Sequence, residues 1–145
     1  MKIRVLFLAA DPSNLPELGL KQEVAQINQN LQASDFGDQI EIVPHWSTKP
    51  DDLIQLLNQD DDWEIVHFSG HGSEAHQRLF VDEFGNSKPV GKVALQRLFG
   101  SLGRKARVAI FNACYAAYRL RDRNVESRRR RGSDSILMRI KLTDE

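Results

Sequence analysis

Two short stretches hold the residues most able to do chemistry, and each follows an apolar run. The first is "HFSGHG", residues 67–72, and the second is "VAIFNACY", residues 108–115, which contains the only cysteine, Cys114. A cysteine attacks as its thiolate, and a neighbouring imidazole can take the thiol proton and later protonate a leaving group. The two stretches therefore predict a His–Cys nucleophilic site, which requires a fold that brings them together.

The glycines beside the second histidine of "HFSGHG" suggest the site's remaining parts. Without a Cβ, backbone can approach a substrate closely, so the N–H of Gly72 can join the N–H of Cys114 in holding a developing oxyanion. We assign the proton transfer to His71. His67 lies four residues earlier on an expected strand, where that spacing does not make a metal pair, and we expect backbone or solvent to partner its ring. His45 and His76 belong to no recognisable group of catalytic or metal-binding residues and are expected at the surface.

Strands and helices alternate in the pattern of apolar residues. Continuous apolar runs predict buried strands, residues repeating at three and four predict helices, and Gly85-Asn86 predicts a hairpin turn. Pro44 removes a donor from the second strand, so that strand either lies at an edge of the sheet or ends at Pro44. Pro16 is expected in the first turn of the first helix. The expected strands cover residues 3–10, 39–46, 63–68 and 107–112, the helices 18–31, 47–57 and 93–102, and the hairpin 78–90.

This order favours an α/β fold with a mostly parallel central sheet. Helices should cover both faces of the sheet and connect the strands by right-handed crossovers. In such sheets the chemistry gathers at the carboxyl ends of the strands. Because "SGHG" and "NAC" each stand at such an end, adjacent strands would set His71 and Cys114 side by side.

Composition sets wider limits on the protein. A chain of 145 residues with 41% hydrophobic and 28% charged content suits one globular domain. It contains no run of about 18 apolar residues and opens "MKIRVLFLAADP", so we expect a cytoplasmic protein that does not enter a membrane. A single cysteine excludes an internal disulfide, so Cys114 is a core thiol or a reactive one.

The net charge of zero hides a difference between the two ends of the chain. Residues 1–118 carry 11 Lys and Arg against 15 Asp and Glu, whereas residues 119–145 carry 9 against 5, and seven arginines fall between Arg119 and Arg131. Such blocks usually stay solvated, so residues 1–118 are expected to form the domain core and 119–145 an arginine-rich tail. Nucleic-acid binding by the tail is the less favoured alternative, because no aromatic residues interleave with its arginines to stack on bases.

Taken together and in order, the motifs resemble the CHAT family of caspase-like cysteine peptidases. The resemblance covers about residues 3–115 and depends on "RVLFLAADP", "LGLKQEVAQI", "WEIVHFSGHG", "LFVDEFGNSKPV" and "VAIFNACY". It implies a three-layer caspase-like fold and an endopeptidase that cleaves protein or peptide substrates without cofactor or metal. It assigns His71 as general base and acid, Cys114 as nucleophile and Gly72 to the oxyanion site. It also makes a regulatory protein partner plausible.

The chain departs from the family after the cysteine. Members normally continue with a helix and further strands, whereas only 31 residues remain here, with one apolar cluster between residues 136 and 142. That cluster either supplies one replacement strand or follows a domain that lacks its last strands. A sheet ending at the Cys114 strand would expose an edge open to self-association. The alternative function is then an inactive or truncated module for binding or regulation. Asp82 is the candidate for a substrate pocket that takes basic residues, with a solvated hairpin as the simpler interpretation.

Overall fold

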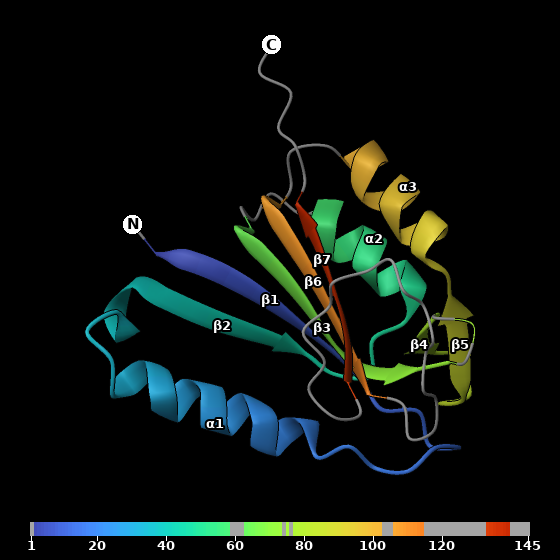
Figure 1. The fold of residues 1–145 in the computed structure, drawn as a ribbon, viewed down its shortest axis with the longest axis horizontal. Helices are drawn as coiled ribbons and strands as arrows, with labels where there is room; N and C mark the ends of the chain where they lie inside the picture. Colours follow the sequence, from blue (N-terminus) through green and yellow to red (C-terminus); the bar gives the residue numbers. More distant parts are fainter. Residues whose placement is uncertain are drawn as a thin grey trace, which may run out of the picture.

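A seven-stranded sheet organises the chain in the computed structural model, which describes residues 2–58, 63–73, 75, 77–102, 106–114 and 133–139 (Figure 1). Strands β2, β1, β3, β6 and β7 lie next to one another in that order, and the β4–β5 hairpin extends from the end of β3. The strands are β1 (Ile3–Ala10), β2 (Ile40–His45), β3 (Ile65–Gly72), β4 (Arg78–Val81), β5 (Ser87–Val90), β6 (Val108–Cys114) and β7 (Ser133–Arg139). The helices are α1 (Leu20–Gln32), α2 (Pro50–Asn58) and α3 (Lys92–Leu102), with a short 3₁₀ turn at Gly37–Gln39.

The sheet is parallel from β2 through β1 and β3 to β6, and antiparallel at β7 and in the β4–β5 hairpin. β1 pairs in parallel with β2 and β3, and β3 pairs in parallel with β6. β7 runs antiparallel to β6, and the hairpin is antiparallel to the end of β3. The protein is therefore a mixed α/β protein, as the alternation of strands and helices predicted. Within the described part of the chain β2 pairs with β1 alone, so of the two alternatives that Pro44 left open the edge position is confirmed.

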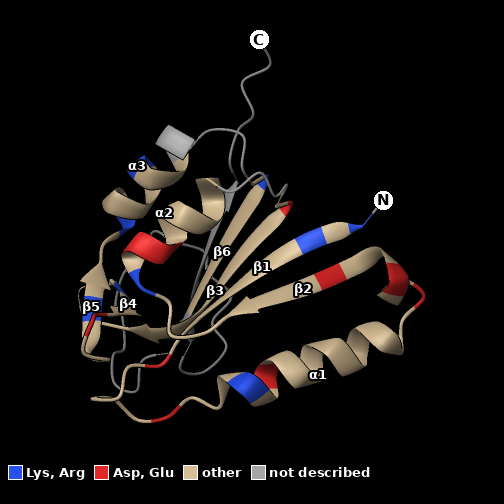
Figure 2. Ribbon diagram, turned by 180° about the vertical axis from the view of Figure 1, so that it is seen from behind, with Lys and Arg blue, Asp and Glu red and all other residues tan. Residues whose placement is uncertain are grey.

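Helices lie on both faces of the sheet (Figures 1 and 2). Successive strand residues point to opposite faces, so each central strand supplies two cores. On one face α2 and α3 pack Leu53, Leu57, Leu95 and Phe99 against Leu6, Leu8, Val66, Phe68 and Phe111. On the other face α1 packs Leu20 and Val24 against Phe7 and Ala9. This double covering explains why the strand sequences are nearly continuous apolar runs.

The C-terminal apolar cluster contributes to the sheet. β7 pairs along the whole length of β6, from Val108 opposite Arg139 to Cys114 opposite Ser133. Of the two alternatives that the sequence left open, the structure contains the added strand, and β6 is not the last strand of the sheet. The expected boundary at residues 118 and 119 and the arginine-rich stretch lie outside the described residues.

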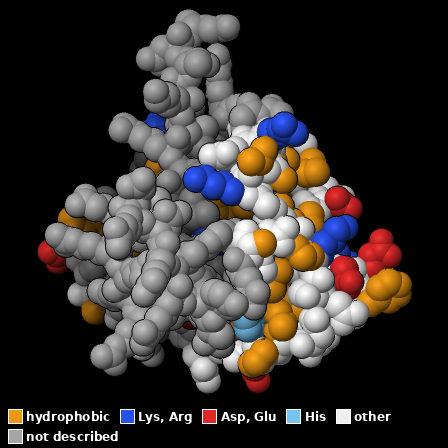
Figure 3. Space-filling view, turned by 45° about the vertical axis from the view of Figure 1, so that its right-hand side comes forward, with side chains coloured by type: hydrophobic (Ala, Val, Ile, Leu, Met, Phe, Trp, Pro, Cys, Tyr) orange, Lys and Arg blue, Asp and Glu red, His pale blue; other side chains and the backbone are white. Residues whose placement is uncertain are grey.

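The helices and the surface of the described residues have two further features. Among the described residues, none of the helices combines the length and the apolar content that crossing a bilayer requires. On the described part of the face in Figure 3, Lys and Arg side chains lie interspersed with Asp and Glu and with apolar side chains. That part of the surface therefore presents both signs of charge.

The order of the strands fixes where a site should lie. The chain passes from β1 outward to β2 and then returns to β3 on the other side of β1. At such a reversal the connections after neighbouring strands cross opposite faces of the sheet, and a crevice opens at their carboxyl ends. Here the reversal lies between the ends of β1 and β3, directly before Asp11 and at His71.

Candidate functional site at the carboxyl ends of β1, β3 and β6

The ends of β3 and β6 meet at the two residues that the sequence singled out. In the parallel ladder of β3 and β6, His71 is the register partner of Cys114. Neighbouring strands lie about 4.8 Å apart, so the two backbones are adjacent at this point. The juxtaposition of strands that the predicted site required is therefore present. This pair is the last of the ladder, and Gly72 follows it and pairs with Arg78 of β4.

A backbone carbonyl holds the His71 ring in place. His71 is buried, with 9% of its surface exposed, and its Nε2 lies 2.8 Å from the carbonyl oxygen of Pro16. A carbonyl oxygen only accepts hydrogen bonds, so Nε2 carries the hydrogen in this contact. In the neutral ring the other nitrogen, Nδ1, is then the unprotonated and basic one. The contact thus fixes both the orientation and the tautomer of the imidazole.

Asp11 lies against the same nitrogen of the ring. Its Oδ1 is 3.6 Å from His71 Nε2, is buried, and has no hydrogen-bond partner in the described part of the chain. Its Oδ2 accepts the Leu18 N–H at 3.1 Å. A carboxylate at this distance attracts an imidazole that has taken up a proton. One oxygen of Asp11 therefore faces the ring while the other fastens the loop that supplies the Pro16 carbonyl.

The β4–β5 hairpin supports that loop, which covers residues 11–19. The Gly85 carbonyl accepts hydrogen bonds from the Ser13 N–H at 2.8 Å and from the Ser13 hydroxyl at 3.0 Å. Asn14 donates through Nδ2 to the Ser87 hydroxyl at 3.2 Å and accepts the Ser87 N–H at 2.9 Å. Gly85 itself has a φ of 83°, a backbone conformation that favours glycine. The hairpin thereby positions the carbonyl that orients His71.

Pro16 does not lie where the sequence placed it. We expected it in the first turn of a helix beginning at residue 18, whereas α1 begins at Leu20 and Pro16 belongs to the preceding loop. Gly19 has a φ of 66°, a left-handed conformation that prevents the helix from extending back to residue 18. The shift matters because it frees the Pro16 carbonyl for His71.

Asp82 is engaged in the hairpin turn. Its Oδ1 accepts the N–H of Phe84 at 2.8 Å and the N–H of Asn86 at 2.9 Å. A side chain that closes a turn in this way stabilises the local backbone. Asp82 does not line the pocket described below. The structure thus gives this candidate residue a contact with the turn, and its predicted part in a substrate pocket stays a prediction.

His67 occupies a drier environment than expected. Its ring stacks on Phe7, with 5.1 Å between ring centroids and 9° between planes, and its Nε2 is buried with no hydrogen-bond partner in the described ranges. The expectation that backbone or solvent partners this ring is wrong for Nε2. Burial lowers the pKa of His67, and the nearby charge of Glu23 opposes that shift. Glu23 itself accepts the Ser69 hydroxyl at 3.0 Å on the same face of β3.

The other histidines lie apart from the site. His45 is half-buried and its Nε2 is 3.3 Å from Asp52 Oδ2, while His76 lies outside the described residues. Burial raises the pKa of Asp52, but the Lys49 N–H, the His45 ring and the positive charges of both residues outweigh burial, so that pKa is lowered. Within the described ranges no three His, Cys, Asp or Glu side chains come together as metal ligands.

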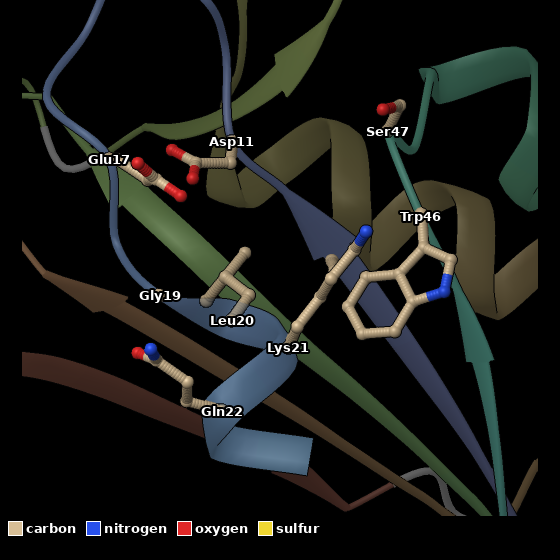
Figure 4. A pocket seen from close by; sticks show the side chains of 9 residues that line it. Asp11, Glu17, Gly19, Leu20, Lys21, Gln22, Trp46 and Ser47 are labelled. Atoms are coloured by element: carbon tan, nitrogen blue, oxygen red, sulfur yellow. The ribbon is translucent and has the colours of Figure 1, made fainter. Parts of the chain in front are cut away.

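A pocket of about 340 Å³ opens beside the site, at the ends of β1 and β2 (Figure 4). Its lining comes from the end of β1, the loop before α1, the first turn of α1 and the residues after β2. Those residues are Ala9, Asp11, Glu17, Gly19, Leu20, Lys21, Gln22, Trp46 and Ser47. Asp11 belongs both to this pocket and to the surroundings of His71. No sequence pattern indicates the pocket, although Asp11 and Trp46 directly follow β1 and β2. Both residues lie at the carboxyl ends of the strands, where catalytic residues were expected.

Comparison of the sequence with protein-family models finds no match, and comparison with curated proteins finds none either. The fold and site by themselves define a mixed α/β protein with a histidine and a cysteine at the ends of adjacent parallel strands.

Proposed function

We propose that the protein is a cysteine endopeptidase with a three-layer caspase-like fold, related to the CHAT family and acting on protein or peptide substrates. The observation that carries this proposal is the pairing of His71 with Cys114 in the β3–β6 ladder, together with the Pro16 carbonyl on His71 Nε2. A nucleophile needs a base close by, and the base needs a third group that orients it. The described residues supply the base and the orienting group.

In the proposed reaction His71 Nδ1 takes the thiol proton as the Cys114 sulfur bonds to the scissile carbonyl carbon. This step requires the Cys114 thiol to lie on the same face of the sheet as the His71 ring. The new imidazolium is stabilised by the Pro16 carbonyl at 2.8 Å and by Asp11 at 3.6 Å from Nε2. The carbonyl oxygen becomes an oxyanion, which the N–H groups of Gly72 and Cys114 hold.

Collapse of this intermediate breaks the carbon–nitrogen bond. His71 Nδ1–H gives its proton to the departing amine, and the acyl group remains on sulfur as a thioester. A water molecule then attacks the thioester carbonyl while His71 accepts its proton, and the thiol takes a proton back as the acid product leaves. Gly72 lies one residue beyond the last β3–β6 pair, which is consistent with an N–H turned toward substrate.

A thiol-directed label tests the dyad, because the chain contains one cysteine and labelling adds one mass increment. The reagent is a peptidyl acyloxymethyl ketone, and intact mass spectrometry gives its rate of reaction with the native chain. We expect His71→Ala to slow the reaction about 100-fold, the lower range for loss of an acid–base group. Cys114→Ala should abolish labelling.

His45→Ala is the matched control, since it removes a half-buried histidine from the opposite side of β1. Its labelling rate should equal that of the native chain. Equal rates in the native chain and His71→Ala would remove the dyad, and the fold would then serve binding or regulation in place of cleavage.

A further inference from the structure

The pocket beside His71 has an acidic end and an aromatic end. In Figure 4 the carboxylates of Asp11 and Glu17 lie on one side, and the side chains of Lys21 and Trp46 lie on the other. The Lys21 ammonium sits 6.0 Å from the centroid of the Trp46 ring. These groups come from three separate parts of the chain, which the ends of β1 and β2 bring together.

The charges of the pocket are not balanced internally. Among the potentially cationic groups of the described residues Asp11 contacts the His71 ring, and neither Asp11 nor Glu17 forms an ion pair with a Lys or Arg of those residues. Lys21 lies over Trp46 and forms no ion pair in the described part of the chain. Two carboxylates against one ammonium leave the pocket with a net negative charge, concentrated at the end nearer His71.

The shape and the walls of the pocket fit a long side chain. A volume of about 340 Å³ is at the small end of the range for ligand sites, so it holds one side chain more readily than a whole small molecule. Leu20 is buried and apolar, while Trp46 leaves 39% of its surface exposed at the rim. Lysine and arginine combine an apolar stem with a charged tip, which matches an apolar wall that ends in carboxylates.

We propose that this pocket binds the cationic side chain of an arginine or lysine in a peptide, with its charged tip at Asp11 and Glu17 and its stem along Leu20 and Trp46. Lys21 repels the tip from the Trp46 end and so fixes the direction in which the side chain enters. Because Asp11 also faces His71, the bound basic residue lies within a few residues of the bond that is cleaved. This inference rests on the proposed peptidase function and adds its substrate class.

The two indole groups of the chain provide an internally controlled measurement. Trp46 lines the pocket, whereas Trp63 is buried elsewhere and donates its Nε1–H to the Leu56 carbonyl at 3.2 Å. The experiment titrates the full chain carrying Cys114→Ala, which cannot turn over, with blocked peptides acetyl-Ala-Ala-Xaa-Ala-Ala-amide. Xaa is arginine, its uncharged analogue citrulline, or glutamate. The readout is the NMR signal of each indole N–H, assigned with Trp46→Phe.

We expect the arginine peptide to shift the Trp46 signal and to leave the Trp63 signal unchanged. Citrulline should bind about tenfold more weakly, as expected for loss of a hydrogen bond to a charged group. Glu17→Gln should weaken arginine binding by a similar factor, while Lys21→Gln should strengthen it roughly two- to fivefold. Asp35→Asn removes an exposed acid outside the pocket and should change nothing. Equal affinity for arginine and citrulline, a preference for glutamate, or no shift of Trp46 would each overturn the proposal.

These measurements distinguish a failure of the proposed pocket from a failure of the proposed peptidase function. Binding is measured without the thiol, so a Trp46 shift in a chain whose native form resists the thiol-directed label would retain the pocket and discard the peptidase. Conversely, His71-dependent labelling that proceeds equally fast with arginine and citrulline reagents would retain the peptidase and overturn the pocket's role.

Discussion

Buried polar atoms on one face of β3 differ sharply in how they are satisfied. His71 Nε2 donates to the Pro16 carbonyl and the Ser69 hydroxyl donates to Glu23, whereas His67 Nε2 finds no hydrogen-bond partner among the residues that the structure describes. Leaving a buried polar atom unpaired costs about 1 to 3 kcal/mol. Stacking on Phe7 offsets part of that cost for His67. The same strand therefore carries one histidine whose ring is oriented by a hydrogen bond and one whose pKa is lowered by burial.

Protonation of His67 should make the stability of the protein fall in mild acid. Because burial lowers its pKa in the folded protein, the unfolded chain takes up a proton first, beginning near the ordinary value of 6.5. Stability is then full above that pH and declines below it, by at most about 1.4 kcal/mol per pH unit for one proton. His67→Phe keeps a ring against Phe7 and removes the proton site. Urea unfolding followed by tryptophan fluorescence at pH 7.5, 6.5 and 5.5 should show a weaker pH dependence in the variant.

The difference in the pH dependence of stability between the native chain and His67→Phe reports on His67 alone, since every other titrating group is common to both proteins. Identical declines in the native chain and His67→Phe between pH 6.5 and 5.5 would contradict the assignment of this proton to His67.

The sequence indicates His71, the proposed general base, more readily than it indicates the groups that orient the His71 ring. His71 stands in a glycine-flanked motif at a strand end, a pattern visible without a structure. The Pro16 carbonyl carries no side-chain signal, because every residue has a carbonyl and only the path of the loop decides which one reaches the ring. Asp11 directly follows the first expected strand, residues 3–10. Its contact with His71 depends on the pairing of β1 with β3, which the sequence pattern does not give.

At the level of elements, Gly70 sets the distance between β1 and β3. A Cβ built on Gly70 would lie 2.8 Å from the Ala10 carbonyl oxygen and 2.8 Å from Cζ of Phe68. Neither neighbour is free to move, since one is backbone and the other is a wholly buried ring. The first glycine of "SGHG" therefore serves close packing of two strands, while Gly72 remains the glycine proposed to face substrate.

Gly70→Ala should destabilise the fold by about 1 to 3 kcal/mol, the usual cost of overpacking a well-packed core. Gly91→Ala is the matched control, because a Cβ there meets nothing within 4 Å and the backbone is not left-handed. That variant should stay within about 0.5 kcal/mol of the native chain. Chemical denaturation measures both values, and equal stabilities of the two variants would contradict the role assigned to Gly70.

The positions of strands and helices could be predicted from the sequence better than the contacts between them. Apolar runs and three-and-four spacing determine which segments can be buried, and so most strands, the helices and the hairpin lie close to the expected bounds. The expected end of the third strand at residue 68 was wrong, because β3 continues through the glycine-flanked motif to Gly72. The start of α1 was misplaced because the left-handed Gly19 is a local choice of backbone that periodicity does not register. The pocket was missed because it joins Glu17 and Trp46, which lie far apart in sequence and share no pattern.

At the scale of the whole molecule, the row of strands from β2 to β7 has two margins that must be protected from pairing with another chain. On one side β2 contains Pro44, which lacks an N–H and weakens that edge as a template for another chain. On the other side β7 covers all of β6, including the positions of Phe111 and Cys114. β7 carries Asp134 and Arg139 in its sequence, and charged residues discourage further strand addition. Without β7 the hydrogen-bonding groups of the more apolar β6 would be open.

Removing β7 should therefore convert the protein into one that associates with itself. A chain ended at residue 132 leaves β6 as the margin of the sheet, and its unpaired N–H and C=O groups can pair with a second copy. A chain ended at residue 139 keeps β7 and is the matched control. Light scattering after size-exclusion chromatography should give a mass that rises with concentration for the shorter chain and stays constant for the control. Far-UV circular dichroism verifies that both retain the fold, and identical, concentration-independent masses would show that β7 does not shield β6 from association.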